Sequence, residues 1–218
     1  MNADAEDFSS NNWDGSASNV TYDAESGIIG GAGASFNGSN SKIGLSANLD
    51  AYIISGSYSV AVLVKLPDSA PATQPIFARG IVSTVGPSYY GTGLIIYSNQ
   101  VQFTRNAGGS AQYVISAPFE FESSKRYLIG VTVNKGASTA TIYIFPLESK
   151  ARGIGSGTIA PVSVGIHASY DQGLNFGANL RNVSNQYASF SANEFLVFST
   201  ILTQKWFIDY AAFLRGFR

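Results

Sequence analysis

Apolar and polar residues alternate with a period of two along most of this chain. The clearest case is SYSVAVLVKL (57–66), which places five apolar residues, from Tyr58 to Leu66, on one face. Successive side chains of a β-strand point to opposite faces of the sheet, so this period predicts a strand with at least one buried face.

Two pairs of such segments are close enough in the sequence to form hairpins. RYLIGVTVN and TATIYIFPL are joined by the turn-rich KGAS, which predicts a hairpin over 126–147. GLIIYSNQVQFTR predicts a second hairpin that turns at 98–100. Further β-rich segments are QYVIS, SVGIHAS, LNFGAN and YASFSANEFLVFS. Strands at intervals of roughly 8–15 residues, joined by Gly, Ser and Asn, favour an all-β antiparallel sandwich of two sheets.

The C-terminal segment TQKWFIDYAAFLRG has a different period. Its large apolar residues recur at helical spacing from Trp206 onward, and Thr203 suits the N-cap position, so we predict a short helix over 203–215. We expect this helix to pack on one edge of the sandwich through Trp206, Phe207 and Tyr210. The sequence contains no repeat and no linker, which predicts one domain over 1–218 with a polar N-terminal arm over 1–15.

The segment GASFNGSNSKIGLS (33–46) raises the question of whether its polar residues bind a ligand. Phe36 is interpreted as a core residue, Asn37 and Gly38 tolerate positive φ, and Ile43 begins the buried face of the next strand. We therefore predict a hairpin that opens the sandwich, rather than a binding site.

The composition excludes several classes of function. Lys and Arg number 13 and Asp and Glu 14, and charged residues make up 12% of the chain, against about 25% in typical domains. Such a chain has no basic patch for nucleic acid, and its weak charge favours contact between copies. The absence of cysteine excludes disulfides, thiolate metal sites and cysteine nucleophiles. No signal peptide is expected in the first 15 residues, and no apolar run suggests membrane insertion.

Candidate catalytic groups are few. His167 is the only histidine, and no partner for acid–base work is evident, so a structural role is favoured. Glu120 and Glu122 would share one face of a strand, as a glycosidase pair could, but FEFESSKR is more typical of a solvated turn. A calcium ion held by loop carboxylates stays open, although no D-x-D-x-D-G loop supports it. We predict no cofactor, no metal site and no enzymatic activity.

Two predicted loops carry candidate contact residues. In GPSYYGTG, Tyr89 and Tyr90 are flanked by Gly and Pro, and paired loop tyrosines can stack on sugar rings or anchor a protein contact. In HASYDQGLN, the candidates are Tyr170, Asp171 and Asn175. For both loops, the alternative is that the aromatic rings cap the edge of the core.

The order of several motifs resembles the laminin-G-like branch of the concanavalin A-like lectin/glucanase superfamily. The matching segments are ASFNGSNSKIGL, YSVAVLVKL, RYLIGVTVNKGASTATIYI, LNFGAN and FSANEFLVFSTILTQKWF. The resemblance implies a jelly-roll sandwich. The chain departs from the pattern at Phe145-Pro146, where the family has Asp-Gly, and at Asn193, where it has Asp. It also lacks the E-x-D-x-x-E strand of the glucanases and the Arg-rich strand of the alginate lyases, so the resemblance implies a non-catalytic role.

Two functions from different classes follow. The first is a structural or adhesion protein on a bacteriophage virion surface, in a capsid or tail, made in the host cytoplasm and bound to other structural proteins or to copies of itself. The alternative is a soluble carbohydrate-binding lectin module that takes cell-surface glycans. A glycosidase or polysaccharide lyase comes third.

Overall fold

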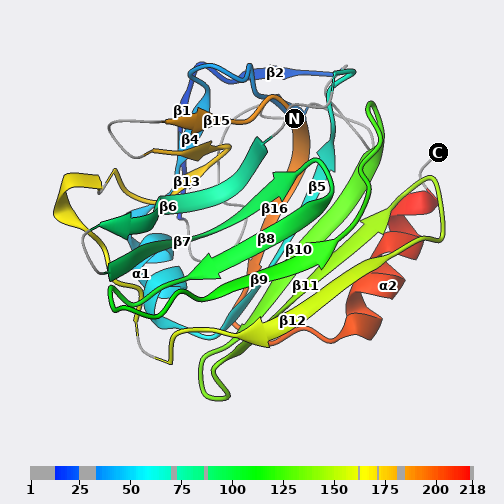
Figure 1. Ribbon diagram of the computed structural model, residues 1–218. Helices are drawn as coiled ribbons and strands as arrows, with labels where there is room; N and C mark the ends of the chain where they lie inside the picture. Colours follow the sequence, from blue (N-terminus) through cyan, green and yellow to red (C-terminus); the bar gives the residue numbers. More distant parts are fainter. Residues whose placement is uncertain are drawn as a thin grey trace.

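The protein folds into two antiparallel β-sheets that pack face to face (Figure 1). The computed structural model describes residues 13–24, 33–69, 73–85, 88–161, 163–170, 172–180 and 185–216, without the side chains of residues 82–85 and 170. Within these ranges each sheet has seven strands, which confirms the predicted all-β sandwich.

We call the two layers the front sheet and the back sheet, as they lie in Figure 1. The front sheet has the order β1 (Ser16–Ser18), β4 (Lys42–Gly44), β13 (Asn175–Phe176), β6 (Thr73–Val85), β7 (Ser88–Tyr97), β8 (Gln100–Arg105), β9 (Val114–Pro118). The back sheet has the order β12 (Gly153–Thr158), β11 (Thr139–Pro146), β10 (Arg126–Asn134), β5 (Tyr58–Lys65), β16 (Ser191–Phe198), β3 (Gly33–Ser35), β2 (Thr21–Asp23). A small hairpin of β14 (Ala178–Asn179) and β15 (Gln186–Tyr187) pairs with neither sheet and packs against β6. A 3₁₀ turn spans Ala168–Tyr170.

Both hairpins predicted from the sequence are present. Strands β10 and β11 pair from Tyr127 with Pro146 to Asn134 with Thr139. Strands β7 and β8 pair from Thr92 with Arg105 to Tyr97 with Gln100. These pairings are local in sequence, and a short turn fixes their register.

Strand β5, in the middle of the back sheet, is buried on both of its faces. In β5, Val60, Val62 and Val64 face the core between the sheets, whereas Ala61 and Leu63 belong to a second apolar cluster on the outer face. Every residue from Tyr58 to Val64 is therefore buried, which explains why this strand is apolar at nearly every position.

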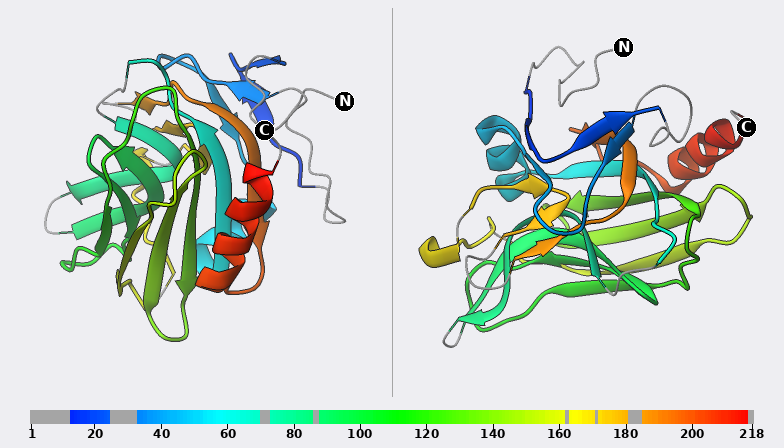
Figure 2. Two further views of the ribbon diagram at one scale, coloured as in Figure 1. Left: turned by 90° about the vertical axis from the view of Figure 1, so that its right-hand side faces the viewer. Right: turned by 90° about the horizontal axis from the view of Figure 1, so that it is seen from above.

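Helix α2 (Gln204–Arg215) covers that outer face, as Figure 2 shows. It begins after Thr203, whose hydroxyl accepts a hydrogen bond from the Trp206 amide at 3.3 Å. The Phe207 ring stacks on Tyr143 with a centroid distance of 4.6 Å. The predicted helix is thus confirmed, but it packs on the outer face of the back sheet and not on an edge of the sandwich.

A second helix, α1 (Ala47–Ser55), was not predicted. Ser46 caps its first turn, because the Ser46 hydroxyl accepts from the Leu49 amide at 3.3 Å. Its last turn is held by Arg105, whose guanidinium donates to the carbonyl oxygens of Ile53 and Ile54, each at 2.7 Å. Neither described helix is long and apolar enough to cross a bilayer.

The segment 33–46 does not form a hairpin. β3 belongs to the back sheet and β4 to the front sheet, so the turn between them carries the chain from one layer to the other. Phe36 is buried in the core, as predicted. The Asn37 side-chain oxygen accepts hydrogen bonds from the backbone amides of residues 39, 40 and 41 at 2.9, 3.0 and 3.2 Å. The polar groups of this turn therefore bond to one another.

Candidate functional site

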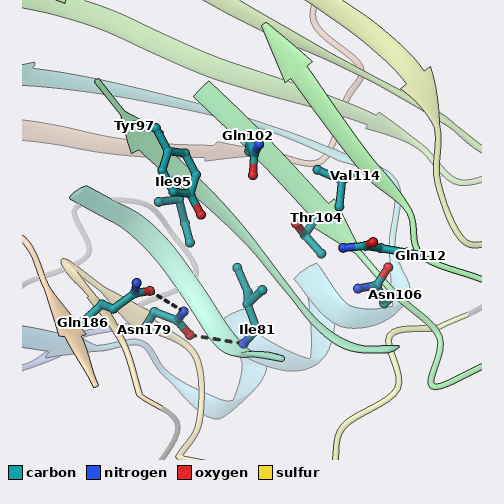
Figure 3. Close-up of a pocket in the computed structure, with 10 residues that line it drawn as sticks. All are labelled: Ile81, Ile95, Tyr97, Gln102, Thr104, Asn106, Gln112, Val114, Asn179 and Gln186. Atoms are coloured by element: carbon teal, nitrogen blue, oxygen red, sulfur yellow. Dashed lines mark hydrogen bonds between the residues drawn. The ribbon is translucent and has the colours of Figure 1, made fainter. Parts of the chain in front are cut away.

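A pocket of about 200 Å³ lies on the outer face of the front sheet (Figure 3). Strand alternation explains its lining, because Leu94, Phe103 and Ile115 point into the core and their neighbours point outward. The lining residues are Ile81, Ile95, Tyr97, Gln102, Thr104, Asn106, Gln112, Val114, Asn179 and Gln186.

The β14–β15 hairpin supplies one wall of the pocket. The Asn179 side-chain amide donates to the Gln186 side-chain oxygen at 3.0 Å, and the Asn179 oxygen accepts from the backbone amide of Ile81 at 3.2 Å (Figure 3). Asn179 is only 1% exposed. This wall is therefore bonded to β6 before any ligand arrives.

Asn106 lies at the opposite end of the pocket, next to Gln112 in Figure 3. Its side chain is fully buried, and its oxygen accepts from the Tyr113 backbone amide at 2.7 Å. Its amide nitrogen, Nδ2, has no hydrogen-bond partner within the described residues. A buried donor without a partner costs about 1–3 kcal/mol, so a group that offers an acceptor here gains more than it would at the surface.

The described residues of the lining combine polar and apolar groups, and none of them is charged. They include five side-chain amides, the hydroxyls of Thr104 and Tyr97, and three aliphatic side chains. Amides both donate and accept hydrogen bonds. The arrangement can bind a compact ligand that carries hydroxyl groups around an apolar ring face.

Arg105 fixes the end of β8 from beneath this pocket. It stands between Thr104 and Asn106 in the chain and points inward, where it bonds to the α1 carbonyls. Tyr58 lies close to Arg105 and is fully buried. Burial raises the pKa of Tyr58 to about 12, against a smaller opposing effect of the Arg105 charge. Burial likewise lowers the pKa of Arg105 from its usual range.

The predicted contact residues Tyr89 and Tyr90 lie in strand β7, and not in a loop. Both side chains are half-buried. The Tyr90 ring packs edge-to-face on His167 with a centroid distance of 5.2 Å, and the Tyr89 backbone bonds to Gly108 and Gly109. Neither tyrosine lines the pocket, so their role in contact with a ligand stays a prediction.

The second predicted loop is only partly described. Asp171 and the side chain of Tyr170 lie outside the described residues. Asn175 is 1% exposed, and its amide donates to the carbonyl oxygens of Gln172 and Gly173 at 3.2 and 3.0 Å. Its side chain thus supports the turn before β13.

The candidate catalytic groups are not brought together. His167 is half-buried, and its Nδ1 accepts from the Ser169 amide at 3.3 Å. Glu120 and Glu122 are exposed between β9 and β10. In the part of the chain that the structure describes, no group of three or more His, Asp or Glu side chains could hold a metal ion.

Part of the pocket could have been found in the sequence. The alternation in QVQFTR already places Gln102 and Thr104 opposite the buried Phe103. Nothing in the sequence places Asn179 and Gln186 beside them, because that wall comes from a hairpin distant in the chain.

Known proteins share the fold of this chain. No protein-family profile matches the sequence, and no curated protein does. Solved structures do match. The carbohydrate-binding module CBM40 of the Ruminococcus gnavus IT-sialidase has a TM-score of 0.57 at 15% identity, over 82% of this chain and 96% of that chain. The botulinum neurotoxin serotype D binding domain has a TM-score of 0.59 at 15% identity, over 97% of this chain and 48% of that chain.

A third similar structure is the full-length tailspike protein 2 of an Escherichia coli bacteriophage. Its TM-score is 0.61 at 13% identity, over 98% of this chain and 28% of that chain. This chain therefore spans less than half the length of the toxin and tailspike chains. At such low identity, these similarities show a shared lectin-like β-sandwich fold.

Proposed function

We propose that this protein is a non-catalytic glycan-binding β-sandwich of the laminin-G-like kind, and that the glycan binds in the front-sheet pocket. The observation that carries the proposal is the lining itself, in which five amides and two hydroxyls surround three aliphatic side chains. Sites of this sort fix a small ligand through a few placed polar groups on an otherwise apolar surface.

The similar structures support this function. One was solved as CBM40 bound to α2,3 sialyllactose, and another as a botulinum neurotoxin binding domain in complex with a sialylated ligand. These ligands belong to those proteins. They support the proposal because they show that a β-sandwich of similar fold can carry a sugar site.

A glycan array with purified protein tests the proposal. We expect binding to a subset of glycans, and a loss of at least about tenfold in affinity for Tyr97→Ala and Gln102→Ala, because both side chains line the pocket. Tyr89→Ala and Tyr90→Ala serve as comparison variants, since neither residue lines it. Loss of binding in the comparison variants alone would move the site to Tyr89 and Tyr90.

A structural role on a bacteriophage virion is the second candidate. The tailspike similarity over 98% of the chain favours it. So do exposed apolar residues at and before α2, since Phe213 is 58% exposed and Ile201 45%. This role is compatible with glycan binding, because an adhesion protein can carry a sugar site.

Light scattering after size-exclusion chromatography tests the virion role, together with antibody detection on purified particles. A monomer that is absent from every particle would contradict it.

A further inference from the structure

We infer that the front-sheet pocket binds a single uncharged pyranose residue, with an acceptor group of that sugar placed at Asn106. This inference rests on the glycan binding proposed above and narrows it to one class of sugar. It sets this chain apart from the similar structures that were solved with sialylated ligands.

The size of the pocket limits the ligand. Its volume of about 200 Å³ is below the range of about 300–1,000 Å³ that is typical of pockets for drug-sized ligands. One sugar ring, with its hydroxyl groups, is a compact ligand of the right order. A longer glycan would have to place its other residues outside the pocket.

The charges around the pocket argue against an acidic sugar. None of the ten described residues that line it is charged. Among the described residues, Arg79, two residues before Ile81 on β6, pairs with Asp50 at 2.5 Å, and Arg105, next to Thr104, donates to the α1 carbonyls. A sialic acid carboxylate that entered the pocket would lose water and gain no counter-charge from the lining, which is unfavourable.

The hydrogen-bonding groups match a neutral sugar instead. Asn106 Nδ2 is a buried donor without a partner, and Asn106 itself is held by the Tyr113 amide. The exposed Gln112 lies beside Asn106 in Figure 3, and in the proposed complex its side chain turns aside so that Nδ2 faces the pocket. A hydroxyl or an acetamido oxygen would then accept from Nδ2, while Gln102 and Thr104 reach other hydroxyls. The aliphatic side chains of Ile95 and Val114 offer surface for the ring C–H groups.

A matched set of sugars tests the inference. The probes are methyl glycosides of glucose, galactose, mannose, N-acetylglucosamine and N-acetylgalactosamine, compared with N-acetylneuraminic acid and glucuronic acid, by saturation-transfer NMR and calorimetry. We expect at least one neutral sugar to bind at least about tenfold more tightly than either acid. Its affinity should change less than twofold between about 50 and 500 mM NaCl, because no charges are paired on binding.

The outcomes separate the two levels of the proposal. Tighter binding of an acidic sugar would overturn the inference and leave glycan binding intact. Binding of neither class, and no signal on the glycan array, would overturn both.

Variants locate the binding. Asn106→Asp keeps the shape of the side chain and replaces the Nδ2 donor with a carboxylate oxygen, so we expect at least about tenfold weaker binding of the neutral sugar. Gln102→Ala covers the case in which Asn106→Asp fails to fold. Gln100→Ala is the matched control, because Gln100 lies two residues before Gln102 on β8 and does not line the pocket. Unchanged affinity in a folded Asn106→Asp and in Gln102→Ala would place the sugar elsewhere.

Discussion

Arg105 connects the interior of the sandwich to the candidate site. It is completely buried, and within the described residues no carboxylate pairs with it. Its hydrogen-bond partners are carbonyl oxygens at the C-terminal end of α1, where a cation is favoured by the helix dipole. The same residue holds the backbone between Thr104 and Asn106, so one buried charge fixes both the end of a helix and the floor of the pocket.

Replacing Arg105 with methionine should therefore destabilise the protein. The change leaves the buried Ile53 carbonyl without its donor and the Ile54 carbonyl with the Val164 amide alone, which predicts a loss of about 2–4 kcal/mol in the free energy of unfolding. Urea denaturation measures it. Arg152→Met is the control, because Arg152 is exposed and its loss should change the stability by less than about 0.5 kcal/mol. Equal effects of the two variants would contradict this role.

The raised pKa of Tyr58 predicts how the stability of the protein responds to alkaline pH. Its pKa is raised from 10.0 to about 12 by burial, so the folded state disfavours the tyrosinate. The stabilisation is complete below the unfolded pKa near 10 and is lost as the pH rises toward about 12. The difference of about two pKa units corresponds to a loss on the order of 2–3 kcal/mol. Denaturation curves from pH 9 to 11.5 should fall less steeply for Tyr58→Phe than for the wild type, and parallel pH profiles would refute the assignment.

At the scale of elements, the correct predictions come from signals that are local in the sequence. The two hairpins and α2 depend on turns, caps and periods that lie within about 20 residues. Helix α1 was missed because only Leu49, Asp50 and Ile53 of its nine residues are buried, too few for a clear helical period. Tyr89 and Tyr90 were expected in a loop, although β6 and β7 pair as far as Val85 with Ser88. The turn at 33–46 looked like a hairpin because the sequence does not show to which sheet a strand belongs.

The contact between α2 and the back sheet depends on Gly130. A Cβ at this position would lie 2.2 Å from Phe207 Cε1 and 2.7 Å from the Val60 carbonyl oxygen. Gly130→Ala should therefore push α2 off β10 and lower the stability by about 1–3 kcal/mol. The cost should shrink in a Phe207→Ala background, which a double-mutant cycle measures.

Gly136→Ala provides the control for this prediction. Gly136 lies in the turn between β10 and β11, where a Cβ would come no closer than 3.5 Å to its nearest neighbour. Its replacement should be nearly neutral. If the Gly130→Ala protein is as stable as this control, the packing of α2 does not require a glycine at position 130.

At the scale of the whole molecule, pairing between distant segments holds the back sheet together. Strand β16 pairs with β5 from Ser191 with Lys65 to Phe198 with Ser59. A chain that lacks residues 191–216 would lose this pairing and α2, and would expose the outer face of β5 and one of its hydrogen-bonding edges. We expect it to give no cooperative thermal transition and a weak near-ultraviolet circular dichroism signal, and a sharp transition would contradict this view.

The position of β5 also sets the order of events during synthesis. The Ser59 hydroxyl donates to the Thr200 carbonyl oxygen, 141 residues further along the chain, and accepts from the Leu202 amide. Strand β5 therefore leaves the ribosome long before β16 and α2 exist to cover it, and contacts of such high contact order form slowly. During that interval its apolar faces are open to chaperones and to other nascent copies. Once α2 has docked, the backbone amides of β5 should be the last to exchange with solvent, because their exchange requires global unfolding.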